Sequence, residues 1–181
     1  MATLPIHDSP PTELISVREY LATSYRPDCD YVDGRIEERN VGEYDHGLLQ
    51  IILGQLFMNH REAWGIQAVT DVRMQVSGSH FRVPDLTVLR AGTPKERIIA
   101  HPPLIVIEIL SPEDRLSRFQ DRIEDYLVFG VEHIWIIDPE RRAAHTATAS
   151  GLHPIRNNEL SVPETPIRVV LSDLFAELDR G

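Results

Sequence analysis

The sequence predicts a single domain of the α/β (α+β) class, with a mixed central β-sheet flanked by helices. Two runs rich in aliphatic residues, 104–110 (LIVIEIL) and 133–138 (HIWIID), have the composition of strands buried on both faces. Amphipathic helical segments precede and separate them, one spanning about 43–61 and one ending at Phe129. Neither an internal repeat nor a linker divides the 181 residues, so we expect one domain over 16–181.

The N-terminal part predicts a short helix and a hairpin after an irregular start. Residues 1–15 contain three prolines, and we expect them to form a flexible lead-in. Ser16 and Glu19 have the spacing of a capping box, which predicts that "SVREYLATS" opens a helix. The Asp33-Gly34 pair within "DYVDGRIEE" predicts the turn of a β-hairpin.

The middle of the chain predicts a long helix followed by strands. Apolar residues recur at helical spacing after Glu43, namely Leu48, Leu49, Ile52, Leu56 and Phe57. "IQAVTDVRMQV" (66–76) and "FRVPDLTVL" (81–89) each predict a strand, with a turn at Gly78-Ser79 between them. Residues 90–103 are expected to form a loop before the first aliphatic run.

The second half predicts a helix between the two aliphatic runs. Ser111 is suited to cap it and Pro112 to occupy its first position, and Gly130 is expected to end it. Trp135 is expected in the core, and Asp138-Pro139 is expected to end the second run. Short strands and a small helix, "LSDLFAEL", are predicted to follow.

Composition limits the classes of function. No apolar stretch approaches the roughly 18 residues of a membrane span, and the N-terminus does not resemble a signal peptide. The single Cys29 offers neither an internal disulfide nor a metal cluster, so we expect a cytoplasmic protein without a membrane partner. The formal net charge of −10 argues against broad electrostatic coating of nucleic acid, although a local basic groove with bound metal ions would suffice.

Two carboxylates interrupt otherwise apolar strand faces. Alternation along 81–89 puts Asp85 on the face of Phe81, Val83 and Leu89, and alternation along 104–110 puts Glu108 on the face of Leu104, Val106 and Leu110. An unpartnered buried carboxylate is expensive. Two acids projecting to the same side suit a hard divalent cation such as Mg²⁺ or Mn²⁺, which would also balance their charge.

The same acids have structural explanations. Glu108 can form an internal salt bridge with an arginine such as Arg82 or Arg122. Asp85 follows Pro84 and can mark a bend. A second Pro-Asp pair, at 27–28, precedes a hairpin rather than a buried strand, so we discount it.

Three segments taken in order resemble a known family. "VPDLTVL" (83–89), "VIEILSPEDR" (106–115) and "DRIEDYLVFGVEHIWIIDP" (121–139) are similar to the Uma-two family of the restriction-endonuclease-like, PD-(D/E)XK nuclease superfamily. The resemblance runs from about Ser16 to Pro139. It implies a restriction-endonuclease-like core, hydrolysis of DNA and, as in related nucleases, a homodimer.

The resemblance also implies roles for particular residues. Asp85 and Glu108 would be the acids that hold Mg²⁺ or Mn²⁺, with the main-chain carbonyl of Ile109 as a further ligand. His46, near the start of the long helix, would be an active-site residue acting on water or in proton transfer, and Glu43 and Asp45 are nearby alternatives.

The catalytic lysine of the superfamily is missing. Its usual place, two residues after the glutamate, holds Leu110, and the only lysine, Lys95, lies in the predicted loop. Uma-two members often carry a lysine four residues before the tyrosine, where this chain has Arg122 before Tyr126. Arginine stays protonated, so Arg122 would supply charge and donors to the phosphate while another group deprotonates the water.

Arg122 also belongs to a basic pattern. Arg115, Arg118 and Arg122 share one helical face, which predicts either a site-facing basic surface or a solvated charged edge.

Two functions follow as hypotheses. The first is a divalent-metal-dependent endonuclease that hydrolyses DNA, with Asp85, Glu108, Arg122 and His46 as site residues. The second is a catalytically degenerate nuclease fold that serves as a nucleic-acid or protein interaction module, which the missing lysine and the net charge of −10 motivate.

Overall fold

The computed structural model describes residues 6–7, 14–26, 28–39, 43–111 and 116–180. The elements in chain order are β1 (Ile6–His7), α1 (Val17–Leu21), β2 (Ser24–Tyr25), β3 (Cys29–Val32), β4 (Arg35–Glu38), α2 (Tyr44–Trp64), β5 (Ile66–Thr70), β6 (Met74–Gln75), β7 (His80–Arg82), β8 (Leu86–Arg90), β9 (Ile105–Ile109), α3 (Leu116–Phe129), β10 (His133–Asp138), β11 (Ala143–Thr148), β12 (Gly151–Pro154), β13 (Glu159–Ser161), β14 (Arg168–Val170) and α4 (Leu171–Leu178). Within this part of the chain no helix combines the length and apolarity needed to cross a membrane.

A mixed six-stranded sheet forms the centre of the molecule, in the order β12-β11-β10-β9-β8-β5. The β9–β10 pair is parallel and the other pairs are antiparallel. The two aliphatic runs of the sequence are these adjacent central strands. Their central position explains why they are apolar on both faces. The predicted class, a mixed sheet flanked by helices, is confirmed.

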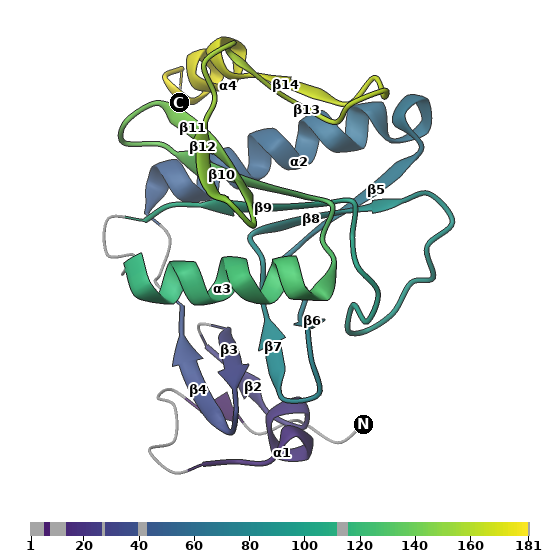
Figure 1. Ribbon diagram of the computed structural model, residues 1–181, viewed down its shortest axis with the longest axis vertical. Coiled ribbons are helices and arrows are strands. Elements are labelled where there is room, and N and C mark those ends of the chain that lie inside the picture. Colours follow the sequence, from purple (N-terminus) through teal and green to yellow (C-terminus); the bar gives the residue numbers. More distant parts are fainter. Residues whose placement is uncertain (1–5, 8–13, 27, 40–42, 112–115, 181) are drawn as a thin grey trace.

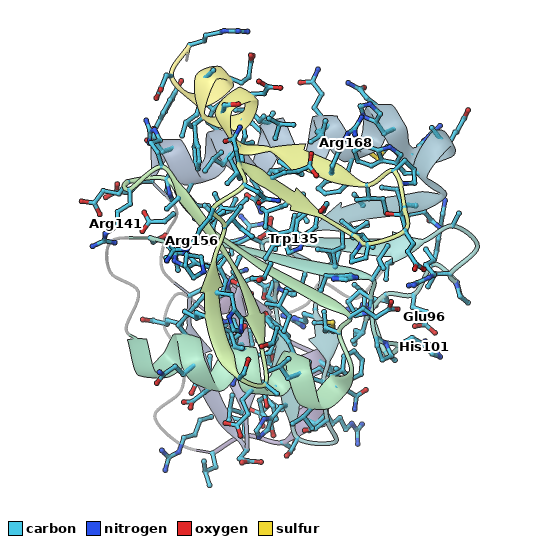
Figure 2. The ribbon with its side chains drawn as sticks, turned by 45° about the horizontal axis from the view of Figure 1, so that its top comes forward. Glu96, His101, Trp135, Arg141, Arg156 and Arg168 are labelled. Carbon is cyan, nitrogen blue, oxygen red and sulfur yellow. The ribbon has the colours of Figure 1, made fainter. Side chains whose placement is uncertain are left out.

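Helices cover both faces of this sheet (Figure 1). On one face α2 packs Leu49, Leu53 and Phe57 into a cluster that also contains α4 and the fully buried Trp135. On the other face α3 contributes Phe119 to a second cluster. Figure 2 shows Trp135 inside the molecule and Glu96 and His101, from the loop between β8 and β9, at its edge.

A smaller four-stranded sheet, β4-β3-β7-β6, lies with α1 at the end of the molecule opposite α4 (Figure 1). Its core is aromatic: the ring of Tyr20 stacks on Tyr31 with centroids 5.0 Å apart and also contacts Phe81. Both local N-terminal predictions are confirmed. Ser16 Oγ accepts the Glu19 N–H at 3.2 Å, and Asp33-Gly34 forms the β3–β4 turn with φ values of 46° and 88°.

The prediction of one strand over 81–89 is wrong. β7 ends at Arg82 and β8 begins at Leu86, and the two strands belong to different sheets. Pro84 has no N–H to donate and restricts the residue before it, so Val83-Pro84-Asp85 forms the passage from the small sheet to the central one. Asp85 is therefore placed by a bend, not by alternation along a strand.

The prediction of one strand over 66–76 is wrong for a similar reason. Asp71 has φ of 52°, in the left-handed region, and it separates β5 of the central sheet from β6 of the small sheet. Between β5 and β8 the chain therefore crosses directly from one sheet to the other twice, and both of these crossings contain an aspartate.

Some predictions fall outside the described residues. Of 1–13 only Ile6 and His7 are described, as β1 paired with β2, so the flexible lead-in remains a prediction. Pro112 and Arg115 are also outside, as are the side chains up to Arg118, so the helix start and the basic face stay untested. From Leu116 the helix runs to Phe129 and stops at Gly130, which has φ of 96°, as predicted.

Candidate active site

The bend between β7 and β8 brings Asp85 against the end of β9, where Glu108 lies. Oδ2 of Asp85 accepts the main-chain N–H of Ile109 at 2.7 Å, and Ile109 directly follows Glu108. Both acids are only 2% exposed. Two carboxylates that are 23 positions apart in the sequence thus share one buried location, because β8 and β9 are hydrogen-bonded neighbours.

Glu108 is held by two side chains of α3. Nη1 of Arg122 lies 2.9 Å from Oε2, and the hydroxyl of Tyr126 donates to Oε1. Arg122 and Tyr126 are four positions apart and so project from the same face of the helix. Of the two arginines considered from the sequence, Arg122 forms the internal salt bridge and Arg82 does not contact Glu108.

Asp85 is held by residues from the other side of the site. Nη2 of Arg39, which follows β4, pairs with Oδ1 of Asp85, and Nε2 of His46 lies 3.4 Å from the same oxygen. His46 comes from the first turn of α2. Arg39 also reaches Asp71, with Nη1 3.5 Å from Oδ1. The two candidate metal-binding acids are therefore each paired with an arginine.

A third buried carboxylate, Asp30 of β3, supports both parts of the site. Its Oδ1 accepts the Val83 N–H at 2.9 Å, two residues before Asp85. Its Oδ2 lies 3.1 Å from Nη1 of Arg82 and 3.4 Å from Nε of Arg122. Asp30 therefore fixes the bend that carries Asp85 and the arginine that contacts Glu108.

The environments of the two acids separate their pKa values. Burial raises the pKa of Glu108 to about 7, with the charge of Asp85 adding to the rise and Arg122 opposing it. Burial also pushes the pKa of Asp85 upward, but Arg39, His46 and the Ile109 amide outweigh it and lower the value to about 2. Such separation is typical of acids that act in catalysis, although ion-pair networks produce it too.

His46 joins the site to a neighbouring pocket of about 580 Å³. Burial lowers the pKa of its imidazole, but the hydrogen bond to Asp85 and the negative charge of Asp85 together outweigh burial and raise the pKa. Its Nδ1 lies 3.4 Å from Oγ of Ser111. The alternatives Glu43 and Asp45 line the same pocket. Oδ2 of Asp45 forms an ion pair with Nη1 of Arg142 at 3.5 Å.

The oxygen donors of the site suit a hard cation. Mg²⁺ is commonly held by one or two carboxylates and several waters, and the buried pair Asp85 and Glu108 supplies such carboxylates. The charge of Asp85 raises the pKa of Glu108, so the two carboxylates lie within electrostatic reach of each other. Among the described residues no group of three or more His, Cys, Asp or Glu side chains is arranged to hold a metal ion. Asp85 and Glu108 would thus hold Mg²⁺ or Mn²⁺ together with several waters.

Sequence reasoning missed several members of this network. Tyr126 was noted only as part of the family pattern, although its place four positions after Arg122 on an amphipathic helix could have indicated it. Arg39 and Asp30 come from the hairpin β3–β4, far from the acids in sequence, and no local pattern marks them. The discounted Asp28 lies apart from these contacts, paired with Arg73 at 3.2 Å. Lys95 is exposed in the β8–β9 loop.

Comparisons with known proteins agree with this fold. The Uma2 family model, described as "Putative restriction endonuclease", matches residues 17–172. An uncharacterized protein of Synechocystis sp. is 29% identical over 137 residues, which cover 66% of this chain and 70% of that protein.

Two solved structures are also similar. A "putative nuclease belonging to DUF820" from Anabaena variabilis is 22% identical, with a TM-score of 0.78, and the match covers 91% of this chain and 99% of that one. At this identity the likeness establishes the fold alone. A DrdV–DNA complex has a TM-score of 0.39 at 18% identity, covering 72% of this chain and 11% of that one, which is too distant for further comparison.

The resemblance seen in the ordered segments around Asp85, Glu108 and Tyr126 is thereby confirmed over most of the sequence. The chain belongs to the Uma2 family of restriction-endonuclease-like proteins.

Proposed function

We propose that this protein is a divalent-metal-dependent endonuclease that hydrolyses phosphodiester bonds in DNA, with Asp85 and Glu108 at its centre. The observation that carries the proposal is that both carboxylates are buried, that Asp85 accepts the N–H of Ile109, the residue after Glu108, and that its charge raises the pKa of Glu108. An isolated structural ion pair would not require a second acid against Glu108. The proposed ligands are both carboxylates and the Ile109 carbonyl.

When bound, Mg²⁺ or Mn²⁺ would polarise the scissile phosphate and acidify a water molecule. Arg122 supplies a permanent positive charge beside Glu108; its buried Nε lies 3.4 Å from Oδ2 of Asp30 but makes no hydrogen bond among the described residues. That guanidinium is suited to stabilise charge that develops on the phosphate. His46, whose pKa is raised by Asp85, lies at the edge of the site beside Asp85 and the neighbouring pocket and is suited to proton transfer.

Nicking of supercoiled plasmid DNA tests this function. We expect cleavage by the wild-type protein with Mg²⁺ or Mn²⁺, no cleavage with excess EDTA, and loss of activity in Asp85→Asn and Glu108→Gln. Arg122→Gln should reduce the rate about 100-fold or more, as for other donors to a developing charge. Glu132→Gln is the matched control, because Glu132 is a half-exposed acid paired with Arg90 at 2.7 Å. Activity in Glu108→Gln equal to the wild type would refute the proposal.

A second candidate function is an interaction module built on a catalytically degenerate nuclease fold. It is favoured by one observation: Arg39 and Arg122 already neutralise Asp85 and Glu108, so the pair is balanced by the chain itself. This alternative predicts neither nicking nor saturable Mn²⁺ binding in the wild type. Gain of cleavage in Arg122→Lys would identify a decayed catalytic site, because lysine is the residue that many family members carry there.

A further inference from the structure

Arg39 occupies the oxygen of Asp85 that the proposed metal site needs. Its side chain is 13% exposed, and its Nη2 pairs with Oδ1 of Asp85. The other oxygen, Oδ2, is taken by the Ile109 N–H. Oδ1 is thus the oxygen through which Asp85 can bind a cation, and a guanidinium and a divalent cation cannot share it without strong repulsion.

The same guanidinium has a second carboxylate within reach. Nη1 of Arg39 lies 3.5 Å from Oδ1 of Asp71, whose side chain is 53% exposed, compared with 2% for Asp85. Arg39 therefore lies between the buried Asp85 and the exposed Asp71.

Gln50 of α2 fixes the spacing of these two acids. Its amide Nε2 donates to Oδ2 of Asp71 at 2.9 Å and to the main-chain carbonyl of Asp85 at 2.8 Å. The side chain of Gln50 thus contacts both the β5–β6 crossing at Asp71 and the β7–β8 crossing at Asp85. We therefore expect Asp71 to stay in place when the partner of Asp85 changes.

We infer that Arg39 is the internal counter-ion of Asp85 that a divalent cation must displace, and that Asp71 retains Arg39 when the cation binds. This inference rests on the proposed function. Arginine stays protonated under all relevant conditions, so it neutralises Asp85 whenever the cation is absent. The exchange lets the acids remain buried in both states, because Asp85 is never without a positive partner.

Calorimetric titration with Mn²⁺ at pH 8 tests the competition. Arg39→Gln should bind Mn²⁺ about tenfold or more tightly than the wild type, because the guanidinium that competes for Oδ1 is gone and only Nε2 of His46, 3.4 Å away, remains beside that oxygen. Arg35→Gln removes the same charge from an exposed position on the adjoining strand β4 and should bind within about twofold of the wild type. Equal affinities for the wild type and Arg39→Gln would overturn the inference.

A double-mutant cycle isolates the role of Asp71. Asp71→Asn should weaken Mn²⁺ binding in the wild-type background, where Arg39 then has Asp85 as its main partner. It should have little effect in the Arg39→Gln background. An equal loss in both backgrounds would show direct attraction between Asp71 and the cation and would contradict retention of Arg39.

Thermal unfolding provides a second readout that does not require activity. Mn²⁺ should raise the melting temperature of Arg39→Gln more than that of the wild type. Arg39→Lys keeps the charge but cannot span two carboxylates, so its Mn²⁺ affinity should lie between those of the wild type and Arg39→Gln. If Arg39→Gln fails to fold, Arg39→Lys replaces it in this test. Absence of saturable binding in every folded variant would refute the metal centre and the inference together. Binding that Glu108→Gln abolishes but Arg39→Gln leaves unchanged would refute the inference alone.

Discussion

Glu108 lies in the middle of an aliphatic strand, and the structure accounts for its burial in two parts. Arg122 and Tyr126 satisfy its oxygens, so the chain alone can keep this carboxylate in the interior. That pairing does not account for Asp85, whose charge lies close enough to raise the pKa of Glu108 further. The proximity of the second acid, not the burial of the first, is what supports a metal site.

His80 offers a test of charge pairing away from the proposed metal ligands. Its Nδ1 lies 2.8 Å from Asp125, and burial, which lowers its pKa, is outweighed by hydrogen bonds to Asp125 and Asp33 that raise it. A folded-state pKa above the unfolded value of about 6.5 contributes stability that is complete below that value and is lost as pH rises through the folded pKa.

We therefore expect His80→Gln to destabilise the protein more at pH 5.5 than at pH 8.5, with a difference of about 1 kcal/mol or less for such a partly exposed pair. Urea unfolding of both proteins at the two pH values measures this. A loss of stability that is the same at both pH values would show that the charge of His80 does not contribute.

Helix α3 connects the two sheets through its polar face. Arg122 and Tyr126 contact Glu108 of the central sheet, while Asp125 lies 2.6 Å from Nε of Arg82 in β7 of the small sheet. Asp30 completes the connection from β3, through Arg82 and Arg122. The site therefore lies where α3 meets the central sheet and the small sheet. Its geometry depends on how this helix and the two sheets are placed relative to one another.

Substitution of Asp30 tests that dependence. Asp30→Asn retains an acceptor for the Val83 amide but leaves the buried Arg82 with less compensation, which should lower the free energy of unfolding by about 3–5 kcal/mol. Asp28→Asn is the matched control on the same segment, because Asp28 pairs with Arg73 and is 36% exposed; it should cost about 1 kcal/mol or less. Equal effects in urea unfolding would show that Asp30 is not a structural centre of the site.

Local patterns predicted most helices and the central strands because these elements express periodicity along the chain. The capping box, the hairpin turn, α2 and the buried strands β9 and β10 all follow from neighbouring residues. The two crossings between sheets were missed, because "FRVPDLTVL" and "IQAVTDVRMQV" alternate as continuous strands would. In the first, the bend after Pro84, which the sequence offers as an alternative explanation of Asp85, is what the structure contains.

At the level of the whole molecule, the site combines segments that no sequence window contains. The strand pattern and the family resemblance predict Asp85, Glu108, Arg122 and His46 as site residues, and the structure brings these side chains together. The arginine that neutralises Asp85 comes from the end of β4, and its role depends on how the small sheet packs against α2 and β8. Such long-range pairing follows from the tertiary fold and leaves no local periodicity to read.

Although the net charge of the chain is −10, the buried acids of the site are each paired with an arginine. The protein therefore does not present an uncompensated cluster of negative charge at the proposed centre before a cation binds. Binding of DNA to such a chain would depend on local positive charge and on the cation, because broad attraction to phosphate is absent.

The proposed function depends on the joint binding of a divalent cation by Asp85 and Glu108. Crystals soaked in Mn²⁺ and measured at the manganese absorption edge test it most directly. We predict an anomalous peak in contact with both carboxylates, with Arg39 moved from Asp85, and no peak in Asp85→Asn. Absence of a peak at saturating Mn²⁺, with Arg39 still paired to Asp85, would contradict the account.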